Sequence, residues 1–94
     1  MPERQVTIVN RLGMHARASA KFVMAASRFK SEVWISKVNG DTRVDGKSIM
    51  GIMMLAAAKG DKVLIGTEGE DAQAALDTLS ALIGKKFGEE GKTK

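Results

Sequence analysis

Hydrophobic and polar positions follow two different periods along the chain, and together they predict four strands and three helices. The first segment, residues 5–10, alternates apolar and polar residues, which is the period of a half-buried strand. Clusters of β-favouring residues predict three more strands, at residues 32–38, 42–44 and 62–66. Because Asn39-Gly40 separates two of these runs, we expect a hairpin there.

Apolar residues at helical spacing lie between the strands. The first expected helix covers residues 16–28. Its apolar residues share one face, and they are Ala18, Phe22, Ala25 and Phe29. A short helix over residues 48–57 is expected to open with Ser48, whose hydroxyl is a typical cap. A longer helix begins near Ala72, with acidic residues at its start and lysines at its end.

The resulting order, β-α-β-β-α-β-α, is typical of a two-layer α+β sandwich. Such a fold has a four-stranded, mainly antiparallel sheet with its helices, here three, on one face. The chain has 94 residues and no internal repeat, so we expect one domain over residues 1–87 and a flexible tail over residues 88–94. Unrelated functions share this architecture, and the fold alone selects none of them.

Composition excludes several classes of site. The chain has no cysteine, which excludes disulfides and thiolate chemistry, and its single histidine argues against an all-protein zinc site. We therefore expect neither a metal nor a cofactor. No apolar run approaches the roughly 20 residues that cross a bilayer, and the polar first residues lack a signal-peptide pattern. We expect a cytoplasmic monomer without membrane insertion.

Charge is distributed unevenly along the chain. Residues 1–65 carry a net charge of +6 and residues 66–94 a net charge of −2. On the first expected helix, Arg17, Lys21 and Arg28 form a basic stripe beside the apolar face. Such a stripe favours an anionic partner, either phosphate, nucleic acid or an acidic protein surface, and we expect Lys21 to contribute to partner docking.

The start of that helix carries the most distinctive chemistry. His15 stands where Ser, Thr, Asp or Asn would usually cap a helix, and Arg17 places a cation where it opposes the helix dipole. Both residues make sense if the helix terminus binds an anion, with Gly13 allowing a sharp turn before it. A neutral imidazole can accept a phosphoryl group, whose charge the guanidinium would stabilise. The alternative is that His15 is an ordinary solvated or core residue.

The short helix that opens with Ser48 is a second candidate site. It is apolar on nearly all sides, which is more than one core-facing side requires. We expect Ile49, Met50 and Met53 to form a docking surface that Met14 extends, and the alternative is that this helix is buried on both sides. A phosphate on Ser48 would place negative charge beside that surface, which makes Ser48 a candidate regulatory site.

RNA binding on the sheet surface is a competing interpretation of the element order and the positive charge. Such proteins stack bases on aromatic residues of central strands. This chain has no Tyr, its three Phe fall in expected helices, and Trp34 is the one aromatic residue in an expected strand. We therefore expect no nucleic acid among its partners.

Two segments together resemble the HPr/NPr family, the histidine-containing phosphocarriers of the bacterial phosphoenolpyruvate-dependent phosphotransferase system. Residues 12–23 (LGMHARASAKFV) are similar to the family's active-site motif, and residues 47–55 (KSIMGIMML) to its motif around a regulatory serine. The resemblance implies an open-faced β-sandwich and a phosphocarrier that is not itself an enzyme. His15 would accept a phosphoryl group on Nδ1 from Enzyme I and donate it to an EIIA-type acceptor. Arg17 would bind the phosphate, and an HPr kinase/phosphorylase would modify Ser48.

One position departs from the family pattern, which usually has proline directly after the arginine. This chain has Ala18 there. Proline preorganises the first helical turn and alanine is a good helix former, so we expect a small change in stability and an intact site. The LGMHAR motif occurs in both the sugar-uptake and the nitrogen-related branches of the family. A diverged regulatory adaptor of the nitrogen-related branch is therefore the alternative function.

Overall fold

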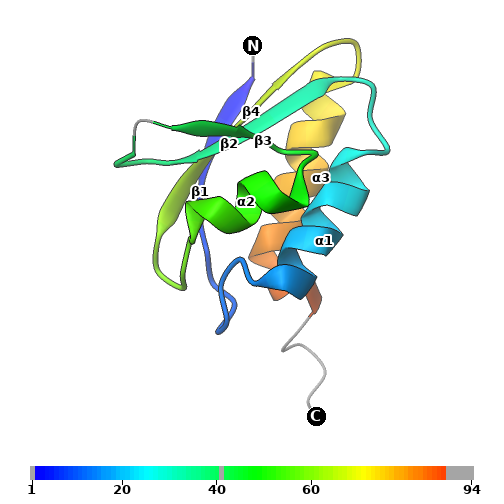
Figure 1. Ribbon diagram of the computed structural model, residues 1–94. Coiled ribbons are helices and arrows are strands. Elements are labelled where there is room, and N and C mark those ends of the chain that lie inside the picture. The colour runs from blue at the N-terminus through cyan, green and yellow to red at the C-terminus, as the bar shows by residue number, and fades with distance from the viewer. Residues whose placement is uncertain (1, 41, 89–94) are drawn as a thin grey trace.

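Four antiparallel strands form one sheet, and three helices cover one of its faces (Figure 1). The computed structural model describes residues 2–40 and 42–88. Its strands are β1 (Glu3–Thr7), β2 (Glu32–Lys37), β3 (Arg43–Asp45) and β4 (Lys62–Glu68), and its helices are α1 (Ala16–Ala26), α2 (Ile49–Leu55) and α3 (Ala72–Gly84). The strand order is β1-β4-β2-β3. This arrangement confirms the expected open-faced α+β sandwich.

The register of the sheet separates a buried face from an open one. Ile65 of β4 lies opposite Ile35 of β2, and both side chains are buried beneath the helices. On the open face, Trp34 lies over Gly66, where an added Cβ would come within 2.3 Å of the indole ring. The guanidinium of Arg43 stacks on the same ring at 4.6 Å. The tryptophan is thus held by glycine and arginine neighbours.

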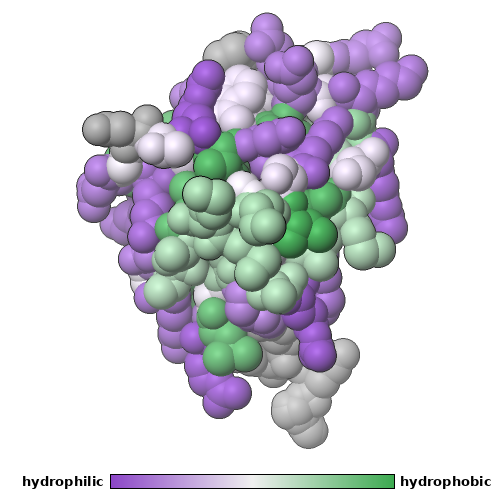
Figure 2. All heavy atoms as spheres, in the orientation of Figure 1, coloured by the Kyte–Doolittle hydropathy of each residue, from purple (hydrophilic) through white to green (hydrophobic). Residues whose placement is uncertain are grey.

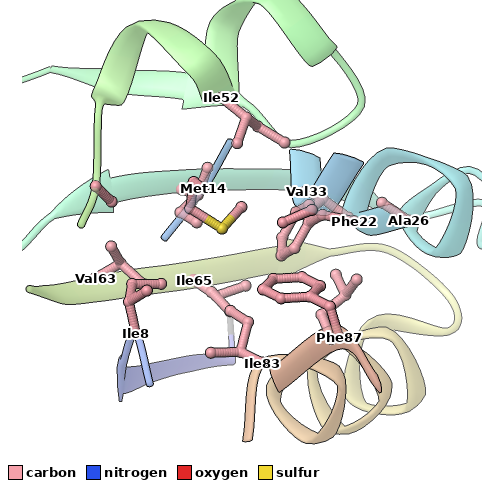
Figure 3. Close-up of a cluster of buried hydrophobic side chains, with 14 of the residues drawn as sticks. Ile8, Met14, Phe22, Ala26, Val33, Ile52, Val63, Ile65, Ile83 and Phe87 are labelled. Carbon is pink, nitrogen blue, oxygen red and sulfur yellow. The ribbon is translucent and has the colours of Figure 1, made fainter. Parts of the chain in front are cut away.

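The hydrophobic core lies between the sheet and the helices (Figure 3). Each helix contributes fully buried side chains, among them Phe22 from α1, Ile52 from α2 and Ile83 from α3. They pack with sheet residues such as Ile65. Large aliphatic and aromatic side chains from the three helices and from β2 and β4 therefore hold the helices against the sheet.

The first helix is shorter than its periodicity predicts. It ends at Ala26, with Ser27 as the C-cap, and its buried positions are Ala18, Ser19, Phe22 and Ala26. The expectation that Phe29 continues the helical face is wrong, because Phe29 lies in the turn that leads to β2. The first strand also ends earlier than expected, at Thr7, although Ile8 keeps a hydrogen bond to the carbonyl of Asp61.

The hairpin between β2 and β3 is present, and the pairing of the two strands places Asn39 and Gly40 at the midpoint of its loop, as expected. Within this loop, the N–H of Gly40 donates to the carbonyl of Lys37 at 3.0 Å. The pairs Ser36 with Arg43 and Trp34 with Asp45 then set the register of the two strands.

The chain reverses direction sharply after the third helix. Lys86, Phe87 and Gly88 have φ angles of +60°, +56° and +75°, a left-handed conformation that non-glycine residues rarely adopt. Phe87 is 2% exposed and packs in the core (Figure 3), which compensates for this backbone. The expectation that Phe87 lies in the long helix is wrong. Residues 89–94 of the expected tail lie outside the described residues.

A carboxylate at the start of α3 ties this helix to the loop before β2. Asp71 accepts hydrogen bonds from the Ser31 hydroxyl and from the backbone N–H groups of Ser31 and Lys30, the latter two at 2.9 Å. The Ser31 hydroxyl above all, followed by the Lys30 N–H, lowers the pKa of Asp71 to about 2 from its usual 3.8. Its ionised form is therefore the one that stabilises the fold.

We expect Asp71→Asn to lower the free energy of unfolding at pH 7 and to flatten its acid dependence. Because the folded pKa is depressed, the carboxylate's contribution is fully present above about pH 4 and is lost as the pH falls through about 2. Urea unfolding at pH 7 and at pH 2.5 measures both effects. Glu70→Gln, at an exposed neighbouring position, is the control, and equal acid dependence in Asp71→Asn and the parent protein would contradict the assignment.

No helix in residues 2–40 and 42–88 is long and apolar enough to cross a membrane. Within the same residues, no group of three or more His, Asp or Glu side chains is placed to hold a metal ion.

Candidate functional site

The loop that precedes α1 is anchored to the chain just after α2. Gly13 has a φ angle of +66°, and a Cβ there would lie 2.6 Å from the carbonyl oxygen of Ala57. The next residue, Met14, donates its N–H to that same carbonyl at 2.9 Å. Asn10 is buried and its Nδ2 donates to the carbonyl of Gly13 at 2.8 Å. Only glycine fits this close approach, as the sequence led us to expect for Gly13.

His15 is the N-cap of α1, which confirms its expected position. Its backbone is extended, and its Nδ1 accepts a hydrogen bond from the backbone N–H of Arg17 at 3.3 Å. The first helical hydrogen bond runs from Ser19 to the carbonyl of His15 at 2.8 Å, so the N–H groups of residues 16–18 precede the helical ladder. In this arrangement Nδ1 lies at the positive end of the helix, and a neutral ring carries its proton on Nε2.

A surface depression of about 610 Å³ brings together the basic residues expected at this site. His15, Arg17 and Lys21 line it, together with Arg11, Leu12, Ala16 and Gly88. Three cationic side chains and a helix N-terminus thus surround the imidazole, and none of the lining residues among those that the structure describes is acidic. This combination can hold a dianionic group close to Nδ1.

Two lining residues, Arg11 and Gly88, lie outside the motif over residues 12–23 that the sequence indicated. Arg11 has a signal in the sequence, since it belongs to the basic excess just before Gly13. Gly88 has none, because only the left-handed turn after α3 brings it to the depression. At this end of the molecule, Lys21 donates from Nζ to the carbonyl of Phe87 at 2.7 Å. The lysine thereby connects α1 to the turn after α3.

The second helix exposes a hydrophobic surface. Ile49, Met50, Met53 and Met54 are 43%, 70%, 41% and 77% exposed, whereas Ile52 on the opposite side is fully buried. Figure 2 shows the hydrophobic area that results over α2. The alternative that this helix is buried on both sides is wrong. A methionine-rich exposed face is typical of adaptable docking surfaces.

Met14 does not extend this surface, contrary to expectation. Its side chain is 4% exposed and points into the core between Ile52 and Ile65 (Figure 3). The reason is the positive φ of Gly13, which turns the chain so that the side chain of Met14 enters the core before His15 emerges. Leu12, 62% exposed, is the large apolar residue that this loop presents instead.

Ser48 caps α2, as expected for a hydroxyl residue at this position. Its Oγ accepts a hydrogen bond from the N–H of Gly51 at 3.0 Å. The preceding residue, Lys47, donates from Nζ to the carbonyl of Phe29 at 2.8 Å and so fixes the start of the helix against the turn that leads from α1 to β2. Ser48 is partly exposed next to Ile49 and Met50 of the hydrophobic surface.

Comparisons with known proteins agree with this fold. The family model for the PTS HPr component phosphorylation site matches residues 2–85. The phosphocarrier protein HPr of Neisseria meningitidis serogroup A is 54% identical over 89 residues, 95% of this chain and 98% of that protein. The phosphocarrier protein NPr of Shewanella violacea is 44% identical over 87 residues, 93% of each. The crystal structure of HPr-C-His from Thermoanaerobacter tengcongensis has a TM-score of 0.89 at 46% identity, covering 96% of this chain and 99% of that one.

The fold and the site define a class of small α+β proteins in which one histidine caps a helix among basic side chains. The chain belongs to the HPr family of phosphocarrier proteins of the phosphotransferase system. Members of this family are carriers and not enzymes in themselves, and membership implies partners among the other components of that system.

Proposed function

We propose that this protein accepts a phosphoryl group on Nδ1 of His15 from phosphorylated Enzyme I and passes it to an EIIA-type acceptor. The observation that supports this most directly is the position of Nδ1, which accepts the Arg17 N–H at the helix N-terminus inside a basic depression. In the transfer, the bond from phosphorus to the donor breaks as the bond to Nδ1 forms. The displaced N–H of Arg17 then becomes a donor to the phosphoryl oxygens.

The basic side chains contribute differential stabilisation to this transfer. Before transfer they surround a neutral ring, and after it they surround a dianion, so their electrostatic contribution increases as the charge arrives. Arg17 can bind two phosphoryl oxygens with its planar guanidinium. Lys21 acts from the same depression, although one of its N–H donors is used by the Phe87 carbonyl.

A transfer assay tests this proposal. The protein is incubated with phosphoenolpyruvate, Mg²⁺ and Enzyme I, and its intact mass is measured before and after brief acid treatment. We expect one added phosphoryl group, labile to acid and mapped to the peptide that contains His15. A folded protein that stays unmodified with an Enzyme I from a closely related bacterium would contradict the proposal.

We propose further that α2 docks the partners through Ile49, Met50 and Met53, and that Ser48 regulates this docking. The exposure of the three apolar side chains supports the first part. The position of Ser48 at their edge supports the second, because a phosphate there would add charge where apolar contacts must form. An HPr kinase/phosphorylase would supply that phosphate.

We expect Ser48→Asp to weaken the affinity for Enzyme I by about tenfold while leaving the fold unchanged. Aspartate caps a helix as well as serine does, so the helix start is kept and only the charge changes. Isothermal titration calorimetry with Enzyme I measures the effect. Ser48→Asn, a neutral cap, is the matched control, and equal affinities for the two variants would refute a charge-based role of Ser48.

The branch of the system and the setting of the protein are further proposals. HPr and NPr relatives both match the chain, so a regulatory adaptor of the nitrogen-related branch is the second candidate. Transfer rates to a sugar-specific and to a nitrogen-specific EIIA distinguish the two.

We expect the protein to act in the cytoplasm as a monomer. Sedimentation of the full chain would test the monomeric state. Filter binding of RNA at several salt concentrations would test the nucleic-acid interpretation, because phosphate contacts weaken steeply with salt.

A further inference from the structure

A groove of about 520 Å³ runs between α1 and α3, and Lys21 is the lining residue that it shares with the His15 depression. Each helix contributes four lining residues, at positions i, i+3, i+4 and i+7. They are Lys21, Met24, Ala25 and Arg28 from α1 and the turn after it, and Thr78, Ala81, Leu82 and Lys85 from α3 and its C-cap. Two helical stripes with the same spacing thus face one another across the groove.

The centre of the groove is apolar and lacks large polar groups. Ala25 and Leu82 are partly buried and pack against the core, so they form a firm floor. Met24 is 67% exposed and adds a large, flexible apolar side chain beside this floor. The small side chains of Ala25 and Ala81 allow a third element to approach both helix backbones closely.

The rim of the groove is basic. Lys21, Arg28 and Lys85 are its charged lining residues, and within residues 2–40 and 42–88 no acidic side chain lines it. The two helices run in opposite directions (Figure 1), so Arg28 lies at one end of the groove and Lys85 at the other, with Lys21 also toward the Lys85 end. An apolar floor between cations complements a ligand that is apolar along one face and acidic along its edges.

We propose that the groove between α1 and α3 binds an amphipathic helix of a partner protein whose flanks are acidic. Its apolar face would pack on Met24 and Leu82, and its Asp or Glu side chains would meet Lys21, Arg28 and Lys85. Three packed helices would result, with interaxial distances typical of helix bundles. Because α1 packs against α2 on one side and α3 on the other, a helix bound here leaves the hydrophobic surface of α2 open.

The groove also adjoins the His15 depression, since Lys21 lines both. A helix bound in the groove would therefore lie beside the site of phosphoryl transfer. The acidic side chains of that helix nearest Lys21 would lie beside the phosphoryl site and would interact electrostatically with the charge of the phosphoryl group. This surface extends the interactions of the protein beyond the transfer partners proposed above.

Nuclear magnetic resonance with a designed probe tests the proposal. The probe is an 18-residue helical peptide with leucine at the i, i+3/i+4 and i+7 positions and glutamate at the flanking positions. A matched peptide has lysine in place of each glutamate. We expect the acidic peptide to cause saturable shifts at the groove residues of the ¹⁵N-labelled protein, and the basic peptide to cause none.

Two variants and one control locate the binding. We expect Met24→Glu and, separately, Lys85→Glu to weaken the peptide affinity by about tenfold or more. Met54→Glu, at an exposed methionine of α2, should leave that affinity unchanged. The proposal is overturned by shifts that map to α2, by equal binding of the basic peptide, or by absence of saturable shifts. It is also overturned if a single-stranded oligonucleotide shifts the groove residues at lower concentration than the acidic peptide does.

Discussion

Replacing His15 with alanine is expected to abolish phosphorylation by Enzyme I and phosphoenolpyruvate, because the chain then lacks its only imidazole. The same change removes the N-cap of α1, which should lower the free energy of unfolding by about 1 kcal/mol. Intact-mass measurement after the transfer reaction records the first effect, and thermal or urea unfolding records the second.

His15→Asn separates these two effects. Asparagine is among the best N-caps and its side chain can accept the Arg17 N–H in place of Nδ1, so stability should return to the value of the parent protein. Phosphorylation should not return, because an amide oxygen does not form a stable phosphoryl adduct. Phosphorylation of either variant would show that another residue carries the phosphoryl group.

Arg17→Ala is expected to slow phosphoryl transfer by roughly a hundredfold, the scale on which the loss of one preorganised donor acts. The side chain is exposed and lies in the first helical turn, where its charge opposes the helix dipole. Its removal should therefore leave the free energy of unfolding within about 0.5 kcal/mol of the parent value. Stopped-flow or quench-flow transfer from phosphorylated Enzyme I measures the rate.

Arg17→Lys is the matched variant for this prediction. It keeps the charge and loses the planar pair of donors, so an intermediate rate indicates that both properties contribute. A rate for Arg17→Ala equal to that of the parent protein would remove Arg17 from the mechanism and leave the helix N-terminus and Lys21 as the stabilising groups.

The types and order of the elements could be predicted from sequence because each long segment has one clear period. The position of His15 at the start of α1 could be predicted for a related reason, since the apolar face begins directly after it and Gly13 precedes it. The exposed face of α2 was one of two possibilities. A helix that is apolar on all sides has no periodic signal to show which side the core covers.

The errors fall where backbone direction depends on distant contacts. Met14 looks like a surface residue beside an exposed histidine, yet the Gly13 turn directs it inward. Phe29 has helical spacing, but α1 ends three residues earlier, and the segment beyond it is held by Asp71, forty residues away in the chain. Phe87 and Gly88 reach the core and the site only through a left-handed turn, which no local pattern in this chain announces.

The hydrogen bond between the His15 loop and Ala57 also couples the integrity of the site to that of the whole fold. The Met14 N–H donates across more than forty residues of chain, and the N–H of Ile8 does the same to Asp61. Such hydrogen bonds join segments far apart in the chain, so amide exchange at Met14 should proceed through global unfolding and not through local fraying. Competence to carry a phosphoryl group is then lost in one cooperative step with the fold. A peptide of residues 12–28 would contain every residue of the motif and still lack the site.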